Sequence, residues 1–261
     1  MQVDGRALEA IDVETSRASM RRAAVAATLA YSTHDSEPWQ IVVRAEACEL
    51  HADPARWLPA QDPVGRHLTL SIGAALLNGR ASLAADGVPH RVLRIPDSGH
   101  PHHLATLTTE GAASPGADSE HDRLAELADR GLARHSIDPR KVRQIEAAEL
   151  ELLTHVVTSA GGILHRAAAD VVVVCTAENR AVDWLRAGEA VQRLVLEAGM
   201  HGLAVAEIVG NLEQPADRAR LLQRLGGAGH PQAVLRLGAA APRVRSRRRP
   251  LAEVLVAPHQ D

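Results

Sequence analysis

Ser32-Thr33-His34-Asp35-Ser36-Glu37-Pro38-Trp39 is a polar segment that joins an alanine-rich stretch to a β-branched one. Residues 17–31 before it contain no glycine or proline, which predicts a helix. Residues 39–43 after it read Trp-Gln-Ile-Val-Val, which is typical of a buried strand. Because a proline disfavours the helical conformation of the preceding residue, the helix must end upstream of Pro38. The short connection therefore carries several hydrogen-bonding side chains, as binding loops often do. Taken alone, the octet is explained more simply as a helix end followed by a core tryptophan.

The composition limits the class of protein. The chain has 261 residues, of which 46% are hydrophobic but only 2% aromatic, and it contains no phenylalanine. This length suffices for one large domain or for two small interleaved halves. The core must be built from alanine, leucine and valine, with three tryptophans as large fillers. The formal net charge of −3 argues against bulk attraction to nucleic acid or to a membrane, so neither is expected as a partner.

The cysteines and the apolar segments indicate the cellular compartment of the protein. Cys48 and Cys175 are far apart and form no metal-spaced set, so we interpret them as buried thiols in a reducing compartment. Residues 1–14 are charged and lack the apolar region of a signal peptide. The most apolar run, residues 167–175, is too short to span a bilayer. A cytoplasmic protein is therefore expected.

Apolar periodicity and turn residues predict an α+β chain. Helices are predicted at residues 5–31, 68–87, 121–132, 138–159, 185–198 and 216–225. Strands are predicted at residues 39–44, 47–52, 90–95, 103–109, 169–176, 204–209 and 232–237. The valine-rich run 169–176 is typical of a central strand that is buried on both faces.

The chain is predicted to consist of two halves. Residues 110–120 are rich in Gly, Ala, Ser and Pro and form the best candidate boundary, which gives halves 1–120 and 121–261, interleaved as one globular unit. Residues 73–88 can be aligned without a gap to residues 188–203, and both segments are apolar helices that start and end with a glycine and run into a strand. Alanine-rich helices match easily by chance, but the similarity suggests two half-domains around a pair of long core helices.

Four segments, in the same order and over most of the chain, resemble the Acg-like branch of the nitroreductase superfamily. Residues 32–39 resemble its S-x-H-N-x-Q-P-W loop. Asp62-Pro63, Arg66 and Ser71-Ile72-Gly73-Ala74-Ala75-Leu76 resemble its D-P-x-G-R and C-G-A-A-L helix start. Residues 198–203 resemble a helix end that runs into a G-L strand. Residues 231–238 and 248–251 resemble the closing P-Q-x-x-x-R-x-G and R-R-P-L elements.

The resemblance implies a nitroreductase-like α+β fold with a central mixed sheet flanked by helices. In this branch, two fused halves form a pseudo-dimer with one flavin site, here shortened in the middle. The implied cofactor is FMN, which passes a hydride from NAD(P)H to a nitro or quinone acceptor, so the expected partners are small molecules. A monomeric pseudo-dimer and a homodimer are both compatible with the sequence.

The resemblance also implies the residues of the flavin site. Arg134-His135-Ser136 resembles the phosphate-binding R-R-S of the family, and Arg forks with hydroxyl donors suit a phosphate monoester. Residues 206–211 match the segment whose backbone faces the flavin ring. No catalytic side chain and no metal ligand is assigned, since hydride moves directly between nicotinamide and flavin. The cofactor-binding residues implied are Ser32, His34, Asp35, Glu37, Arg134, His135, Ser136 and Arg248.

Two departures from the family pattern support an alternative function. Asp35 and Glu37 replace amides, and an ionised carboxylate offers no hydrogen-bond donor. Such a carboxylate near the pyrimidine edge opposes the negative charge of reduced flavin, so bound FMN is expected to be hard to reduce. The stretch between Ala160 and Ala169 is too short for the insertion that helps to cover the flavin in longer relatives. The alternative is a catalytically silent flavin-binding or sequestering protein, or a flavin-free stress-associated protein, of the same fold.

Two further clusters of the sequence contain side chains that can bind ligands. His100, His102 and His103 have no Cys or Asp partner in metal-ligand spacing, so a solvated loop is favoured over a metal site. The arginines between residues 243 and 249 are as compatible with contacts to a flavin phosphate as with a solvated tail.

Overall fold

The computed structural model describes residues 5–97, 99–110, 118–132, 136–138, 141, 144–208, 212–241 and 248–257, without the side chains of residues 5–13 and 118–119. The α+β class is confirmed. The helices are α1 (Gly5–Ala27), α2 (Arg66–Ala85), α3 (Asp118–Arg130), α4 (Ala147–Ser159), α5 (Ala181–Met200), α6 (Pro215–Leu225) and α7 (Leu251–Val254). The strands are β1 (Trp39–Val43), β2 (Ala47–Ala52), β3 (His90–Arg94), β4 (His103–Thr109), β5 (Ile163–Ala168), β6 (Val171–Thr176), β7 (Leu203–Glu207), β8 (His230–Ala239) and β9 (Leu255–Val256).

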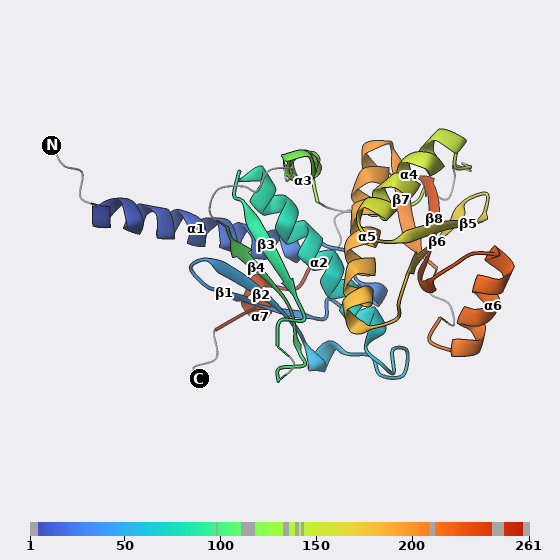
Figure 1. The fold of residues 1–261 in the computed structure, drawn as a ribbon, viewed down its shortest axis with the longest axis horizontal. Coiled ribbons are helices and arrows are strands. Elements are labelled where there is room, and N and C mark those ends of the chain that lie inside the picture. The colour runs from blue at the N-terminus through green and yellow to red at the C-terminus, as the bar shows by residue number, and fades with distance from the viewer. Residues whose placement is uncertain are drawn as a thin grey trace.

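The strands form two sheets, one on each side of a central pair of helices, α2 and α5 (Figure 1). The first sheet has five strands in the order β3-β4-β2-β1-β9 and is mixed, because β9 runs parallel to β1. The second has four antiparallel strands in the order β5-β6-β8-β7. The predicted mixed sheet is therefore present, and the second, antiparallel sheet was not anticipated.

Helices α2 and α5 cross in direct backbone contact. A Cβ atom placed on Gly73 of α2 would lie 2.0 Å from the carbonyl oxygen of Leu185, and one on Gly188 of α5 would lie 1.9 Å from that of Leu70. The two glycines are those that head the two aligned segments of the sequence. Glycine is required at both positions because no other residue lets the two backbones approach this closely.

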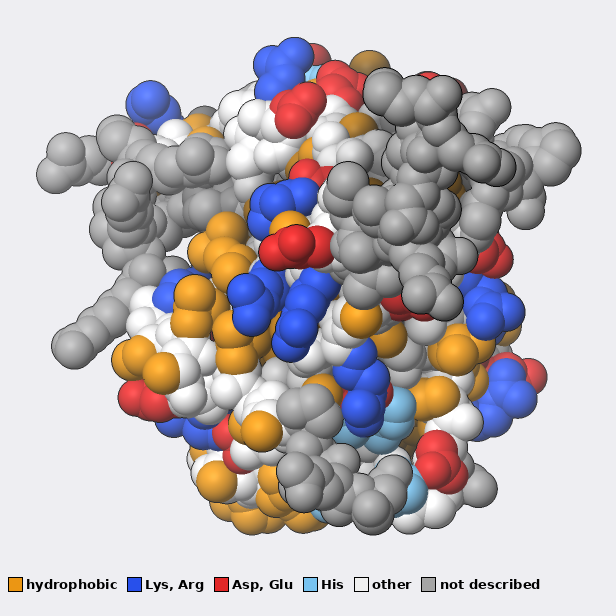
Figure 2. Space-filling view, turned by 90° about the vertical axis from the view of Figure 1, so that its left-hand side faces the viewer, with side chains coloured by type: hydrophobic (Ala, Val, Ile, Leu, Met, Phe, Trp, Pro, Cys, Tyr) orange, Lys and Arg blue, Asp and Glu red, His pale blue; other side chains and the backbone are white. Residues whose placement is uncertain are grey.

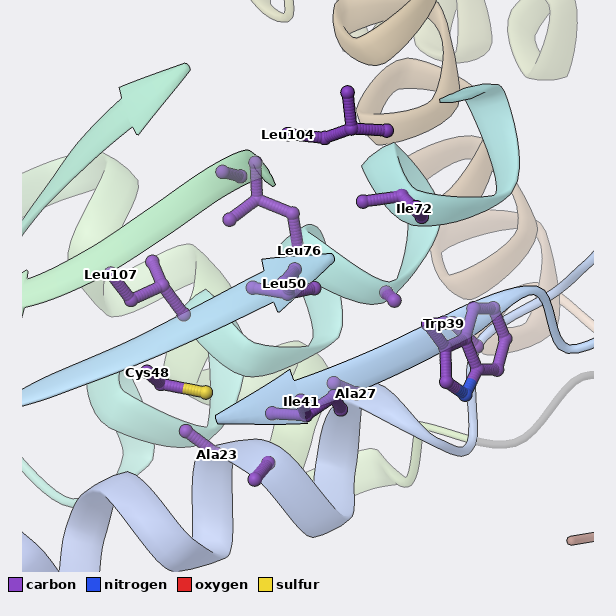
Figure 3. Packing of buried hydrophobic residues seen from close by; sticks show 14 of the residues in the cluster. Ala23, Ala27, Trp39, Ile41, Cys48, Leu50, Ile72, Leu76, Leu104 and Leu107 are labelled. Carbon is purple, nitrogen blue, oxygen red and sulfur yellow. The ribbon is translucent and has the colours of Figure 1, made fainter. Parts of the chain in front are cut away.

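Helices α1 and α2 cover the inner face of the five-stranded sheet and enclose the first core. Trp39, Ile41 and Leu50 from the strands meet Ile72 and Leu76 of α2 there (Figure 3). Trp39 is fully buried, so it fills the core as the octet alone suggested. Cys48 lies in the same core, and burial raises the pKa of its thiol to about 12.

The second core lies between α4, α5 and the four-stranded sheet. The valine-rich strand β6 lies between β5 and β8, and Val172, Val173 and Val174 are fully buried, which confirms the prediction of a central strand. Burial also raises the pKa of the Cys175 thiol to about 12, so the interpretation of both cysteines as buried thiols is confirmed. Strand β5 was not predicted, because its residues are half-buried or exposed and lack an apolar run.

Several predicted helix boundaries were wrong, and the largest error has an identifiable cause. The helix predicted from residue 138 begins only at Ala147, because the Asp138 N–H donates to the Ala239 carbonyl and Ile137 bridges to Ala240. The first helix ends at Ala27 rather than at residue 31. Strand β9, only two residues long, was not predicted, although it places residues 255–256 beside β1 in the five-stranded sheet. The division at residue 120 stays a prediction.

Within the part of the chain that the structure describes, no helix combines the length and the apolar character needed to cross a bilayer.

Candidate functional site

The loop between α1 and β1 is conformationally strained. His34, Asp35 and Glu37 have φ angles of 58°, 50° and 45°. Residues other than glycine lose about 1–3 kcal/mol each in such conformations. Among the described residues, the only other non-glycine residue with positive φ is Ile95. Strain concentrated in one loop persists only where surrounding contacts fix it, and it is typical of ligand sites.

Buried hydroxyl groups hold this loop against the start of α2. The Thr33 N–H donates to Oγ of Ser71 over 3.2 Å, and the Glu37 N–H donates to Oγ of Ser32 over 3.1 Å. Ser32, Thr33 and Ser71 are almost fully buried. The loop and the first turns of α2 therefore form one rigid unit.

The N-terminus of α2 is fixed by the preceding segment. Oδ2 of Asp62 accepts from the Leu68 N–H over 2.9 Å, a favourable place for a negative charge beside the helix N-terminus. Gly65 enters the helix with a φ of 74°, which explains the glycine at this point of the D-P-x-G-R-like segment. The next two residues, Arg66 and His67, are consequently directed toward the second half of the chain. There they lie beside Glu207 and Glu213, and we call this polar region, which also contains Tyr31, the junction.

Arg66 is fully buried and bound to the second half of the chain. Its Nε donates to Oε1 of Glu213 over 2.9 Å, and its guanidinium also donates to the backbone carbonyl of Gln232. Nε2 of His67 lies 2.6 Å from the same Glu213 oxygen. Although burial alone would raise it, the hydrogen bonds and charges of His67 and Arg66 lower the pKa of Glu213 to about 2. Glu213 is therefore ionised at neutral pH.

A second carboxyl group, Glu207 at the end of β7, has the opposite character. Its side chain is only 5% exposed, and Oε1 lies 4.0 Å from Nδ1 of His67. The Tyr31 hydroxyl is hydrogen-bonded to Oε2 of Glu207. Burial, and then the negative charge of Glu213, raise the pKa of Glu207 to about 8. At neutral pH this carboxyl group is mostly protonated, so the junction holds one proton donor beside one fixed anion.

Next to these groups is a small recess of about 20 Å³, room for about one water molecule. Thr33, His34 and Ser36 line it from the strained loop, and His67 lines it from α2. Nδ1 of His67 and Oε2 of Glu213 are buried and have no hydrogen-bond partner among the described residues. The junction thus retains unused hydrogen-bonding capacity next to a recess.

Glu37 ties the loop to the C-terminal arginines. Oε2 accepts from the Arg249 N–H over 3.1 Å, and Oε1 lies 3.5 Å from the Arg248 guanidinium. Arg248 also donates to the Leu29 carbonyl, and Arg249 lies 3.3 Å from Asp53. The charge of Glu37 is therefore compensated inside the protein, and both arginines bind protein groups rather than forming a solvated tail.

We expect Glu37→Gln to lower the free energy of unfolding by about 2 kcal/mol, because a neutral amide weakens charge-assisted bonds to two largely buried arginines. Denaturant unfolding measures the change. The matched control is Glu46→Gln in the turn between β1 and β2, where the side chain is exposed and a change below about 0.5 kcal/mol is expected. Equal effects of the two variants would contradict an anchoring role of Glu37.

The structure brings some of the implied cofactor-binding residues together. Ser32 and Glu37 are buried in the loop, His34 and Asp35 are exposed on it, and Arg248 contacts Glu37. Ser136 is exposed, and its carbonyl accepts from the Ala241 N–H over 2.8 Å. Arg134 and His135 lie outside the described residues, as do residues 209–211. The cofactor role of the whole set stays a prediction.

Most of the polar groups at the centre of the junction were not predicted from the sequence. Tyr31, His67, Glu207 and Glu213 come from four separate segments and show no motif spacing. Arg66 is indicated by the sequence only through the resemblance to the D-P-x-G-R segment. One signal was available: Tyr31 is the only tyrosine of the chain, and it immediately precedes the polar loop.

No family model matches the chain. Similarity to individual proteins is nevertheless extensive. A Mycobacterium tuberculosis protein described as the proposed NAD(P)H nitroreductase acg is 26% identical over 300 residues, covering 85% of this chain and 91% of its own length. The chain resembles the Acg-like nitroreductases. A second M. tuberculosis protein described as a proposed NAD(P)H nitroreductase is 27% identical over 82% of this chain, which spans 61% of that relative. A third, uncharacterized M. tuberculosis protein is 24% identical over 90% of this chain and 92% of its own.

Among solved structures, a proposed nitroreductase in complex with FMN from Desulfovibrio desulfuricans matches with a TM-score of 0.40 and 19% identity. The match covers 56% of this chain and 97% of that nitroreductase.

Proposed function

We propose that the protein is an FMN-binding, nitroreductase-like oxidoreductase whose flavin site is the junction between the 32–38 loop, the start of α2 and the end of β7. The observation that carries the proposal is the coincidence of two independent features at one place. The loop that resembles the family's S-x-H-N-x-Q-P-W segment is the strained loop, and it borders buried polar atoms that have no hydrogen-bond partner among the described residues.

The polar chemistry of the junction suits a flavin. The ring of FMN carries donors and acceptors along one edge and needs matching groups in the protein. Nδ1 of His67 has no hydrogen-bond partner among the described residues, and the hydroxyl groups of Thr33 and Ser71 lie nearby on the same rigid unit. Thr33, His67 and Ser71, with His34 at the exposed rim, are the side chains that would hold the ring.

The recess is much smaller than a flavin. Ligand pockets are typically about 300 Å³ or larger, whereas the recess measures about 20 Å³. Binding of FMN therefore requires the exposed rim of the loop to move outward while Thr33 and Ser71 keep their hydrogen bond.

FMN, when bound, supplies hydride transfer between NAD(P)H and an acceptor, and a nitro compound or a quinone is the proposed acceptor class. The chain's own contribution is to hold and protect a proton. Glu207 is buried and mostly protonated at neutral pH, whereas Glu213 and Arg66 neutralise each other beside it. Reduction of either acceptor consumes protons, and Glu207 is the buried group placed to hold one.

A second function, a catalytically silent or flavin-free protein of the same fold, is favoured by one observation. Glu37 and Arg248 are already paired with each other, so neither group offers an unpaired charge to a cofactor. The strained loop would then serve only to anchor the C-terminal segment.

The experiment that separates these functions is FMN titration of the protein, followed by flavin fluorescence. We expect stoichiometric binding, weakened about 10- to 100-fold by His67→Ala, because a buried hydrogen bond to the ligand is lost. Arg134→Ala should weaken binding similarly if the R-R-S-like segment holds the phosphate. His90→Ala on β3 is the control and should bind like the unchanged protein.

Consumption of NADH or NADPH in the presence of a nitroaromatic or quinone then tests turnover. Binding with turnover supports the oxidoreductase, and binding without turnover supports the silent protein. No binding at high micromolar FMN would reject a flavin site at this junction.

A further inference from the structure

A separate cluster of metal-binding side chains lies on the outer face of the five-stranded sheet. Cys48, Leu50 and Ala52 of β2 point into the first core, so the alternate residues Glu49 and His51 point away from it. His103 of β4 lies opposite His51 in the sheet, and the two imidazole rings are stacked, with centroids 4.4 Å apart. In Figure 2, histidine side chains appear beside basic and acidic ones on the end of the molecule that carries this sheet.

A β-bulge brings His103 to this face. The register between β2 and β4 shifts after the pair Leu50 and Ala105, so that His51 is paired with His103 instead of Leu104. Leu104 and Ala105 are consequently both buried in the first core, whereas His103 is turned outward. Bulges of this kind redirect a side chain and are frequent beside functional sites.

We propose that Glu49, His51 and His103 form a binding site for a divalent transition-metal ion, with zinc as the best-matched ion. Two imidazoles and one carboxylate are a common zinc ligand set, and three protein ligands leave a fourth position for water. One potential ligand atom from each of the three residues lies within 4.8 Å of those of the other two. The proposal is independent of the flavin site, because these residues take no part in the junction.

The distances require only a small closure. Ligand atoms bound tetrahedrally to one zinc ion lie about 2.1 Å from it and therefore about 3.4 Å from one another. Side-chain rotations must bring the groups together by at most about 1.4 Å, and all three side chains are half-buried rather than fixed in the core.

The three proposed ligand side chains are held in place by hydrogen bonds to one another and to neighbouring side chains. Nε2 of His51 lies 3.1 Å from Oε2 of Glu49, and Nε2 of His103 lies 2.7 Å from the Thr106 hydroxyl. Nε of Arg44 donates to the other Glu49 oxygen over 2.5 Å. Groups that hold the ligands in this way orient them and limit the freedom lost on binding. The positive charge of Arg44 repels a bound cation. Solvent screens this repulsion because the Arg44 side chain is 47% exposed.

The test uses the full chain without a histidine tag, treated with a chelator and then titrated with Zn²⁺ by calorimetry. We expect one Zn²⁺ per chain, and we expect His51→Ala and His103→Ala each to weaken binding about 100-fold because each removes a ligand. His90→Ala is the matched control: His90 is on β3 of the same sheet, and its ring lies near that of His121 instead. Binding to this variant should be unchanged.

Titration with Co²⁺ provides a second, spectroscopic measurement that does not depend on the heat of binding. Tetrahedral coordination by the three side chains and water should give visible absorption bands that disappear in His51→Ala. Absence of stoichiometric Zn²⁺ binding, binding that survives both His51→Ala and His103→Ala, or binding lost in His90→Ala would each overturn the proposal. Circular dichroism melts of the three variants ensure that a loss reflects the ligand and not unfolding.

Discussion

Gly188→Ala and Gly73→Ala are each expected to destabilise the protein by at least about 4 kcal/mol, enough to prevent folding of many domains of this size. A Cβ on Gly188 would lie 1.9 Å from the Leu70 carbonyl oxygen, and one on Gly73 would lie 2.0 Å from that of Leu185. Both obstacles are backbone atoms of a buried helix and cannot rotate away. The substitution must therefore push α2 and α5 apart along their whole contact.

The two contacts are reciprocal. Gly73 faces Leu185 and Glu189, and Gly188 faces Leu70 and Ala74. A shift of 115 positions along the sequence converts each residue of one contact into its counterpart in the other, and this is the shift of the internal similarity. Because the contact is reciprocal, the two substitutions should have similar effects, and the double variant should not be twice as severe, since the helices separate only once.

Gly79→Ala is the matched control in the same helix. A Cβ there would meet the terminal methyl group of Leu107 at 2.9 Å, a flexible side-chain end rather than backbone. The helix propensity gained over glycine, about 1 kcal/mol, offsets the small shift of Leu107. Denaturant unfolding of soluble material should therefore place Gly79→Ala within about 1 kcal/mol of the unchanged chain. A Gly188→Ala protein that unfolds at the same denaturant concentration would show that the close crossing is not essential.

Much of the fold followed from local sequence patterns. The valine run of β6, the β-branched segment of β1 and the long apolar stretches of the two core helices are continuous in the sequence, so local patterns located these elements. The start of α4 did not follow, because the Asp138 N–H is bound by Ala239, a residue about one hundred positions away. Strands β5 and β9 were not predicted because neither has a local signal. Strand β5 is largely exposed, and β9 is two residues long and exists through its pairing with β1.

The candidate site was predictable only where it is continuous in sequence. The 32–39 loop was identified because its residues are adjacent and lie next to a proline. The partners of that loop were not identified, because pairing of Glu37 with Arg248 and of Arg66 with Glu213 depends on how the two halves meet. The same limit explains why His103 was assigned to a solvated loop: its neighbour His51 is brought to it by sheet pairing, not by spacing.

Glu207→Gln is expected to stabilise the protein, and the gain should grow as the pH rises from about 4.5 to about 8. Burial raises the pKa of the Glu207 carboxyl group from 4.5 to about 8, so the folded protein keeps a proton that the unfolded chain releases in this window. The folded state then binds more protons than the unfolded state, and the free energy of unfolding falls with rising pH. Glutamine still accepts a hydrogen bond from Tyr31 but does not titrate.

The size of the gain follows from the displacement of the pKa. Each pKa unit corresponds to about 1.4 kcal/mol, so we expect the stability difference between Glu207→Gln and the unchanged protein to increase by more than this amount between pH 5 and pH 8.5. Above pH 8.5 the difference should level off, because Glu207 is then ionised in both states. Urea unfolding at a series of pH values gives the difference directly. A difference that is constant with pH would show that Glu207 titrates normally.

Glu213→Gln should behave in the opposite way and serves as the internal comparison. Its carboxylate has a pKa lowered to about 2 by His67 and Arg66, so its stabilising effect is present above about pH 4.5 and disappears as the pH falls toward 2. This variant should therefore be less stable than the unchanged protein at neutral pH, by about 3 kcal/mol or more, because the buried Arg66 loses its counter-charge. The two carboxyl groups flank the same histidine, so opposite pH trends from adjacent substitutions would identify the junction as one proton-holding group beside one fixed charge. Parallel trends would mean that the proton is shared by the pair, and the assignment of the proton to Glu207 would then be wrong.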